Sequence, residues 1–182
     1  RLSCSSLATA DRLRGEGRGL GLPRVFPFGT DKELRVSVKR CAWVPLNDTL
    51  YVAYHDREWG VPVWDDRLLF EFLTFEGAQA GLSWATILHK REHYRAVCAG
   101  LDPEAVARFD DQRLAALFAD PGVVRNRAKL TAMVGNARAY LDLAAEYGTA
   151  AAALWQFVEG RPVQNHWPDL HAVPALSPAS EA

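Results

Sequence analysis

Glu76 is the acidic side chain whose position in the sequence is most informative. It follows Leu69 by seven residues, in a segment whose apolar side chains, Phe72 and Leu73 among them, recur with the period of a helix. A carboxylate on the apolar face of a helix is costly to bury unless hydrogen-bond donors or a positive charge meet it. Two interpretations follow from the spacing: Glu76 reaches water or an arginine, or it faces a ligand that needs a negative charge.

Aromatic side chains are dense in the same part of the sequence, between Trp43 and Trp84. Most such groups are simply hydrophobic core. Tyr51 and Tyr54, however, stand beside the polar sequence HDRE of residues 55–58, where a buried helix or strand would be less polar. Flat aromatic faces beside a carboxylate suit a planar, electron-poor or cationic ring, through stacking and cation–π attraction. A nucleobase is a ring of this kind.

Cys41 and His55 carry a thiol and an imidazole, which are natural zinc ligands, with thirteen residues between them. Two ligands make only half of a tetrahedral site. On spacing alone, a buried thiol and an unrelated surface histidine are the simpler interpretation.

A run of basic residues follows the sequence Pro121-Gly122, at the start of a long predicted helix. Its members are Arg125, Arg127, Lys129 and Arg138. Free backbone N–H groups and the helix dipole favour an anion at such a position. The alternative is a solvated helix face.

Helices must position these residues, because helical periodicity runs through most of the chain after Lys39. Asp65 is a predicted N-cap for the helix that contains Glu76, and Gly77 and Gly81 are predicted to interrupt that helix. The helix that starts at Ser83 should run to about residue 97, and the long helix should end at Gly148. Further helix starts are predicted at Asp102, Asp110 or Asp111, Asn126 and Thr149. No alternating run is long enough for a strand, so the sequence predicts an all-α, multi-helix fold.

Composition bounds the class of protein. The 182 residues are 49% hydrophobic and 24% charged, which is typical of a globular domain. The net charge of -1 argues against a protein that coats nucleic acid through bulk electrostatics, although it leaves room for a local basic face. The three cysteines are odd in number and widely spaced, unlike a secreted disulfide framework, so we expect a cytoplasmic protein. No apolar run reaches the roughly 18 residues of a membrane span.

Residues 1–39 differ from the rest of the chain. They are rich in glycine, contain prolines, and lack a helical apolar period. We expect a disordered leader or upstream read-through there, and a single domain over residues 40–182.

Four segments together resemble the DNA-3-methyladenine glycosylase I family: RCAWV at 40–44, YVAYHDREWGVP at 51–62, LFEFLTFEGAQAGLSWATILHKRE at 69–92 and GVVRNRAKLTAMVGNARAYL at 122–141. This bacterial family belongs to the helix-hairpin-helix glycosylase superfamily and acts in base excision repair. The resemblance implies an all-α glycosylase domain. It also implies a monomeric hydrolase that releases free 3-methyladenine from alkylated double-stranded DNA and has no membrane partner.

The resemblance also assigns roles to residues. Glu76 would be the catalytic residue: it would hydrogen-bond the flipped base, and its charge would favour the cationic nucleotide and the positive sugar of the transition state. Four aromatic side chains would wall the base: Tyr51, Tyr54, Trp59 and Trp84. Cys41 and His55 would be two of the four ligands of a structural zinc ion. No Schiff-base lysine is implied, so strand nicking is not expected.

Relatives continue beyond the position of Ala182 into a Lys-Arg-Gly-Phe-x-Phe-Val-Gly hairpin and a late His-x3-Cys motif. The resemblance therefore implies a glycosylase domain without its C-terminal hairpin and with only half of its zinc ligands. Two other functions stay open: an inactive truncated fragment that retains at most a purine-binding pocket, and a related glycosylase with a different base preference.

Overall fold

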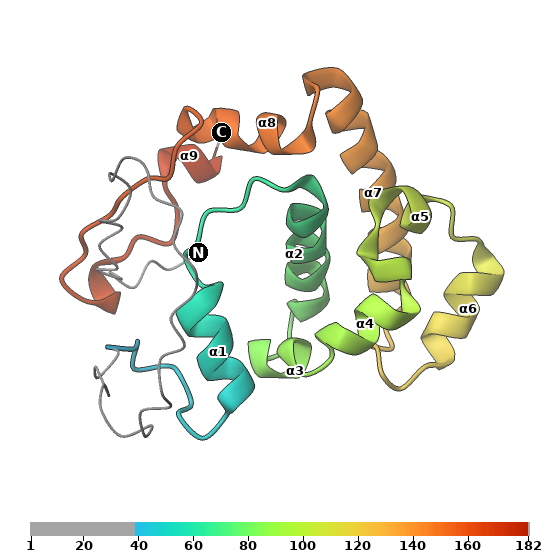
Figure 1. Ribbon diagram of the computed structural model, residues 1–182, viewed down its shortest axis with the longest axis horizontal. Helices are drawn as coiled ribbons and strands as arrows, with labels where there is room; N and C mark the ends of the chain where they lie inside the picture. The colour runs from blue at the N-terminus through green and yellow to red at the C-terminus, as the bar shows by residue number, and fades with distance from the viewer. Residues whose placement is uncertain (1–38, 182) are drawn as a thin grey trace, which may run out of the picture.

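The computed structural model describes residues 39–181, and all of the secondary structure in this range is helical (Figure 1). This confirms the predicted all-α class. The predicted leader, residues 1–39, lies outside the described residues except for Lys39. The α-helices of the described range are α1 (Thr49–Arg57), α2 (Asp66–Gln79), α3 (Trp84–Leu88), α4 (Arg91–Val97), α5 (Pro103–Ala107), α6 (Asp111–Ala119), α7 (Arg127–Tyr147), α8 (Ala150–Trp155) and α9 (Pro178–Glu181). Short 3-10 helices span Ala99–Leu101, Gln156–Val158 and Leu170–Ala172.

Polar N-caps start most of these helices, as the sequence predicts. The Asp65 carboxylate accepts a hydrogen bond from the Leu68 N–H at 2.8 Å, and the Asn126 side chain accepts one from the Lys129 N–H at 3.2 Å. At its other end α7 stops at Gly148, whose φ of 84° favours glycine. The same cap contact is made by Asp48, Ser83, Asp102, Asp110 and Thr149.

Three features of the helices differ from the prediction. Helix α1 was not predicted, because Tyr54 is its only buried residue and the helix shows little apolar periodicity. Gly77 does not interrupt α2, whose neighbouring residues Phe75 and Ala78 are buried in the core and keep the helix intact. The predicted helix over 83–97 divides into α3 and α4. The break lets α3 bury Trp84 while α4 turns Tyr94 onto α2.

Helix α2 runs through the middle of the molecule, with α1 on one side, α7 on the other, and α3 and α4 at its end (Figure 1). The long helix α7 packs against α2, α5, α6 and α8. The core lies between them: Phe75 is fully buried and meets the Tyr94 ring edge-to-face, with 5.7 Å between the ring centroids. Within the described residues no helix is both long and apolar enough to cross a bilayer.

A buried ion-pair network joins α2, α4 and the end of α1. The Arg91 guanidinium donates to the Glu58 carboxylate at 2.8 Å and to the Glu71 carboxylate at 3.2 Å. Arg95 donates to Glu71 at 2.9 Å. Burial by itself would raise the pKa of Glu71, but the hydrogen bonds from Arg95 and Arg91 bring that pKa below its usual value. Glu71, rather than Glu76, is therefore the buried carboxylate of α2, and it is compensated by two arginines.

Replacing Phe75 by alanine should lower the free energy of unfolding by about 3–5 kcal/mol, because the substitution leaves a cavity against Tyr94. Urea unfolding followed by tryptophan fluorescence measures the change. On the same helix Leu73 is 43% exposed, and Leu73→Ala should cost less than about 1 kcal/mol. Equal losses in the two variants would contradict the assignment of the core to this face of α2.

Candidate functional site

Five aromatic rings from three separate segments meet beside α2, and we refer to them as the aromatic cluster: Trp43, Tyr51, Tyr54, Trp59 and Trp84. The ring of Trp43 has its centroid 5.9 Å from that of Tyr51 and 5.2 Å from that of Trp59. Tyr54 lies 5.2 Å from Trp84 by the same measure. The structure thus brings together all four aromatic residues that the sequence assigns to base binding.

Local structure explains how the rings converge. Tyr51 and Tyr54 are three residues apart on α1, which places them on one face of the helix. Trp59 follows directly after the last turn of α1, whose end is held by the Glu58–Arg91 ion pair. Trp84 is the first residue of α3. Tyr54 and Trp84 are buried, whereas Tyr51 and Trp59 are partly exposed, so the cluster has both a wall and an accessible side.

Trp84 carries a polar group that is buried at the aromatic cluster's Tyr54–Trp84 contact. Its indole Nε1 is buried and has no hydrogen-bond partner within the part of the chain that the structure describes. A buried donor without an acceptor costs about 1–3 kcal/mol. An acceptor on a bound ligand would remove this cost.

Glu76 lies on the last turns of α2, and its side chain is exposed. It lines a hollow of about 390 Å³, and it is the one charged residue among the described residues that line it. This Glu76 hollow is otherwise largely apolar, bounded by residues 60–63, Phe72 of α2 and Trp155 of α8. Such a volume is within the usual range for small-molecule pockets.

The Glu76 hollow and the aromatic cluster adjoin one another without coinciding. The four predicted base-binding rings are not among the residues that line the hollow, as the structure describes it. Gly60, which lines it, follows Trp59 in the sequence. The predicted partners are therefore neighbours, with the carboxylate on α2 and the rings on α1 and α3.

Cys41 and His55 lie side by side. The backbone N–H of Cys41 donates to Nε2 of His55 at 3.4 Å, and Nδ1 of His55 lies 3.0 Å from an oxygen of Asp56. Arg40 donates to the same carboxylate, and these contacts lower the pKa of Asp56 to about 2. The ring of His55 also packs edge-on against Trp43, so this group of residues anchors the chain before α1 to the aromatic cluster.

The Cys41–His55 pair does not by itself form a metal centre. Among residues 39–181 the structure places no three His, Cys, Asp or Glu side chains where they could hold one metal ion. Both ring nitrogens of His55 already have polar neighbours. The described residues do not complete a tetrahedral zinc site.

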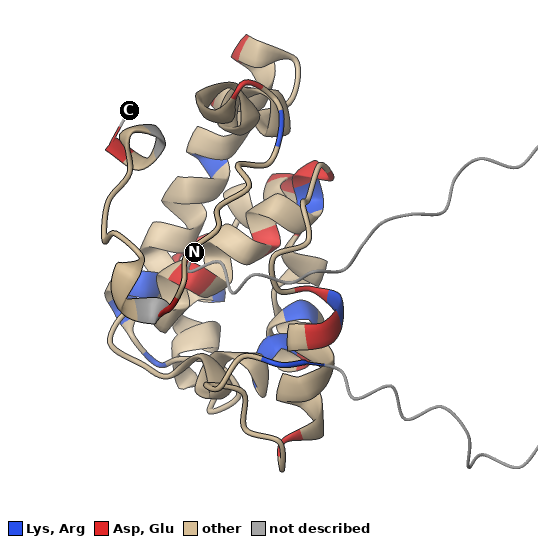
Figure 2. Cartoon of the chain, turned by 90° about the vertical axis from the view of Figure 1, so that its left-hand side faces the viewer, with Lys and Arg blue, Asp and Glu red and all other residues tan. Residues whose placement is uncertain are grey.

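The basic run at the start of α7 is largely engaged in internal contacts. Lys129 donates to two carbonyl groups at the end of α2, and Arg138 donates to the carbonyl of Ala107. Arg125 is exposed. On the side of the molecule seen in Figure 2, basic and acidic segments are interspersed along the described ribbon rather than gathered into a basic stripe.

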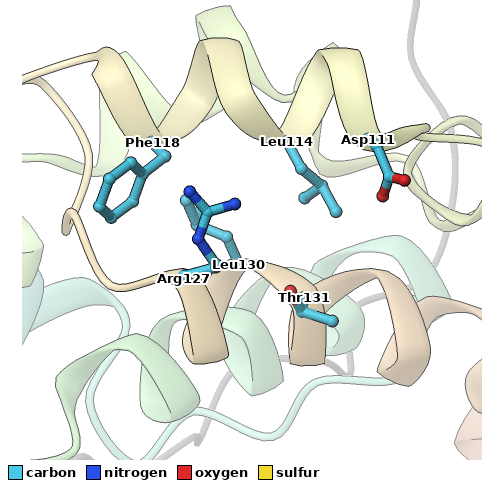
Figure 3. A pocket seen from close by; sticks show the side chains of 6 residues that line it. All are labelled: Asp111, Leu114, Phe118, Arg127, Leu130 and Thr131. Atoms are coloured by element: carbon cyan, nitrogen blue, oxygen red, sulfur yellow. The ribbon is translucent and has the colours of Figure 1, made fainter.

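A second hollow, of about 410 Å³, lies between α6 and α7. Figure 3 shows Arg127 of α7 reaching toward Phe118 of α6 inside it, and the guanidinium carbon lies 4.9 Å from the centre of that ring. This hollow is on the side of the molecule away from α1 (Figure 1). Its cation is already paired with an aromatic face, which gives no reason to expect a ligand there.

Two features of the site were not assigned from the sequence. Trp43 belongs to the dense aromatic group of the sequence but was given no role in base binding, although it is a hub of the aromatic cluster. Glu58 and Arg91 hold the end of α1 on α4, but their pairing spans 33 residues and leaves no local pattern.

Comparison with known proteins shows the family of this chain. A family model described as methyladenine glycosylase matches residues 43–182. The chain is 43% identical to DNA-3-methyladenine glycosylase 1 of Escherichia coli (strain K12) over 80% of this chain and 77% of that protein. It is 42% identical to the DNA-3-methyladenine glycosylase of Haemophilus influenzae over 79% of this chain and 77% of that protein.

Solved structures share the fold. A crystal structure of 3-methyladenine DNA glycosylase I aligns with a TM-score of 0.74 at 44% identity, covering 79% of this chain and 78% of that one. The Staphylococcus aureus 3-methyladenine DNA glycosylase I, in a structure that describes 3-methyladenine recognition, aligns with a TM-score of 0.70 at 36% identity, covering 72% and 70%. With the family match over most of its length and the same helical fold, this chain belongs to the methyladenine glycosylase family.

Proposed function

We propose that this protein is a DNA-3-methyladenine glycosylase, a hydrolase that cleaves the N-glycosidic bond of 3-methyladenine in alkylated double-stranded DNA. Family membership and the similarity to relatives named for this activity support the proposal. The observation that carries it is the aromatic cluster, in which Tyr54 and Trp84 present buried rings next to a hollow with one carboxylate. We expect the protein to act as a monomer in the cytoplasm.

The chemistry of the substrate sets modest demands on the enzyme. Methylation at N3 makes the adenine cationic in DNA, so the glycosidic bond is already weak and the base departs as a neutral molecule. The base must leave the helical stack, enter a shaped pocket, and expose the anomeric carbon to water. As the bond breaks, its electron pair neutralises the base, and the attacking water gives its proton to solvent.

The aromatic cluster supplies the pocket. Tyr54 and Trp84 would stack against the extruded base or wall it, and Tyr51 and Trp59 would border its open side. Stacking on aromatic side chains is worth about 1–3 kcal/mol per base, which helps to offset the cost of unstacking. The N–H of Trp84, which has no partner among residues 39–181, would donate to an acceptor nitrogen on the base.

Glu76 supplies the negative charge. A base lying between residues 59–60 and α2 would meet ring faces on one side and the Glu76 carboxylate on the other. The carboxylate would hydrogen-bond the edge of the base and favour both the cationic nucleotide and the positive sugar of the transition state. The apolar walls of the Glu76 hollow, Phe72 and Trp155 among them, would strengthen this interaction by excluding water.

Replacing Glu76 by glutamine and, separately, Tyr54 by alanine should each lower kcat/KM for base release roughly ten-fold or more, because the first removes the charge and the second a stacking face. Release of 3-methyladenine from methylated duplex DNA measures both effects. Glu146→Gln, at an exposed position on α7, is the matched control and should release base at the wild-type rate. Undiminished release by both site variants would falsify the assigned roles.

A monofunctional mechanism predicts that borohydride treatment during turnover traps no covalent enzyme–DNA adduct, because water rather than a lysine attacks the sugar. Denaturing electrophoresis of the treated mixture detects an adduct, and a glycosylase with lyase activity serves as the positive control. A band at the summed mass of protein and DNA would rule the water mechanism out.

Zinc binding by Cys41 and His55 is kept as a proposal, and no step of the mechanism passes through zinc. The backbone N–H of Cys41 contacts the His55 ring, but the Cys41 sulfur is disulfide-bonded in this structure, and the two residues supply only two of the four ligands that a structural site uses. We therefore expect the zinc content of the purified 182-residue chain to fall well below one atom per chain, measured by plasma emission spectrometry. A stoichiometric content that Cys41→Ser abolishes would show that the site is complete.

A further inference from the structure

Lys129 contacts the end of the helix that carries Glu76. Its Nζ donates to the carbonyl of Ala78 at 2.8 Å and to the carbonyl of Ala80 at 2.5 Å. The last carbonyl groups of a helix have no partner within the helix, and a cation at that end also interacts favourably with the helix dipole. Lys129, about fifty residues further along the chain, therefore supplies both a hydrogen-bond donor for these carbonyls and a positive charge at the C-terminus of α2.

The contact lies at one end of the loop that joins α2 to α3. Residues 80–83 form this loop, which turns at Gly81 with a φ of 77°. Inside it the Leu82 N–H donates to the Gln79 carbonyl at 2.6 Å, and Ser83 caps α3. The Lys129 side chain ties this loop to α7 through the Ala80 carbonyl.

The same loop separates the two sides of the candidate site. Glu76 stands on α2 shortly before the loop, and Trp84 is the first residue after it. The path of residues 80–83 therefore sets how the carboxylate and the indole ring lie relative to each other. Small displacements of groups that hold a substrate are costly to its binding and reaction.

We propose that Lys129 is a positioning residue for this site: by binding the Ala78 and Ala80 carbonyls it holds the α2–α3 loop so that Glu76 and Trp84 face the same base. The role deepens the glycosylase function proposed above and rests on it. In this proposal Lys129 acts within the protein and does not bind a DNA phosphate. An ammonium group has three donors, and two of those on Lys129 are used by carbonyl groups.

The two roles differ in a property that can be measured. A phosphate contact matters for DNA but not for the free base, and its loss reduces the salt dependence of DNA binding by about one unit of slope. A positioning residue matters for the free base as well, and its loss leaves the salt slope unchanged. Arg125, exposed in the same basic run, is the matched control because, within residues 39–181, the side-chain hydrogen bonds to the end of α2 come from Lys129.

The experiment compares wild type, Lys129→Met, Lys129→Arg and Arg125→Met. Tryptophan fluorescence gives the affinity for free 3-methyladenine, and DNA binding is measured over a series of salt concentrations. Lys129→Met should weaken binding of the free base ten-fold or more with an unchanged salt slope. Lys129→Arg should recover most of the affinity, because a guanidinium can also donate to two carbonyls. Arg125→Met should leave the affinity for the free base as in wild type.

Hydrogen–deuterium exchange of the ligand-free protein separates this proposal from the proposed function. Lys129→Met should speed exchange at residues 80–84 and leave α5 unchanged, whether or not the protein turns over methylated DNA. If Lys129→Met does not unfold cooperatively, Lys129→Gln, which keeps an amide NH2 group but no positive charge, replaces it with the same expectations. Wild-type exchange at residues 80–84, or wild-type affinity for the free base with a reduced salt slope, would overturn the positioning role.

Discussion

The buried charge of Glu71 is the constraint on which the arrangement of the site depends. A carboxylate removed from water must be compensated where it lies, and Arg91 and Arg95 of α4 both donate to it. Arg91 also lies over the rings of Phe72 and Phe75 and reaches Glu58, the last residue before Trp59. This ion-pair network therefore fixes α4 on α2 and fixes the end of α1 beside them, next to Trp59 of the aromatic cluster.

Charged groups of opposite sign make contacts at the two ends of α2: a carboxylate at its N-terminus and an ammonium group at its C-terminus. The helix dipole favours both charges at these positions. At its start, the Asp66 carboxylate accepts hydrogen bonds from the N–H groups of Ala150 and Ala151, at 3.2 and 2.7 Å. These are orphan donors at the start of α8, so Asp66 links two helix N-termini. At the C-terminal end of α2, Nζ of Lys129 on α7 donates hydrogen bonds to the carbonyls of Ala78 and Ala80. The central helix is thus tied at both ends to the second half of the chain.

This scaffold suits a reaction in which the enzyme binds and orients more than it activates. A cationic base that leaves as a neutral molecule needs a rigid pocket and a nearby negative charge more than it needs a strong acid. In the proposed mechanism, rings from α1 and α3 would wall the base, and α2 would present the carboxylate. Each of these elements is held by polar contacts outside the aromatic cluster.

The sequence by itself determined the all-α class, most of the helix starts and the family, because these depend on local patterns. An N-cap such as Asp65 or Asn126 acts on an N–H three residues away, and the motif residues lie close together in the chain. It did not reveal α1, whose single buried residue leaves no apolar stripe, nor that Glu71 is the buried carboxylate of α2 while Glu76 is exposed. Only the tertiary structure decided those points. The arginines that compensate the buried charge of Glu71 lie twenty or more residues further along the chain, so no local pattern shows the pairing.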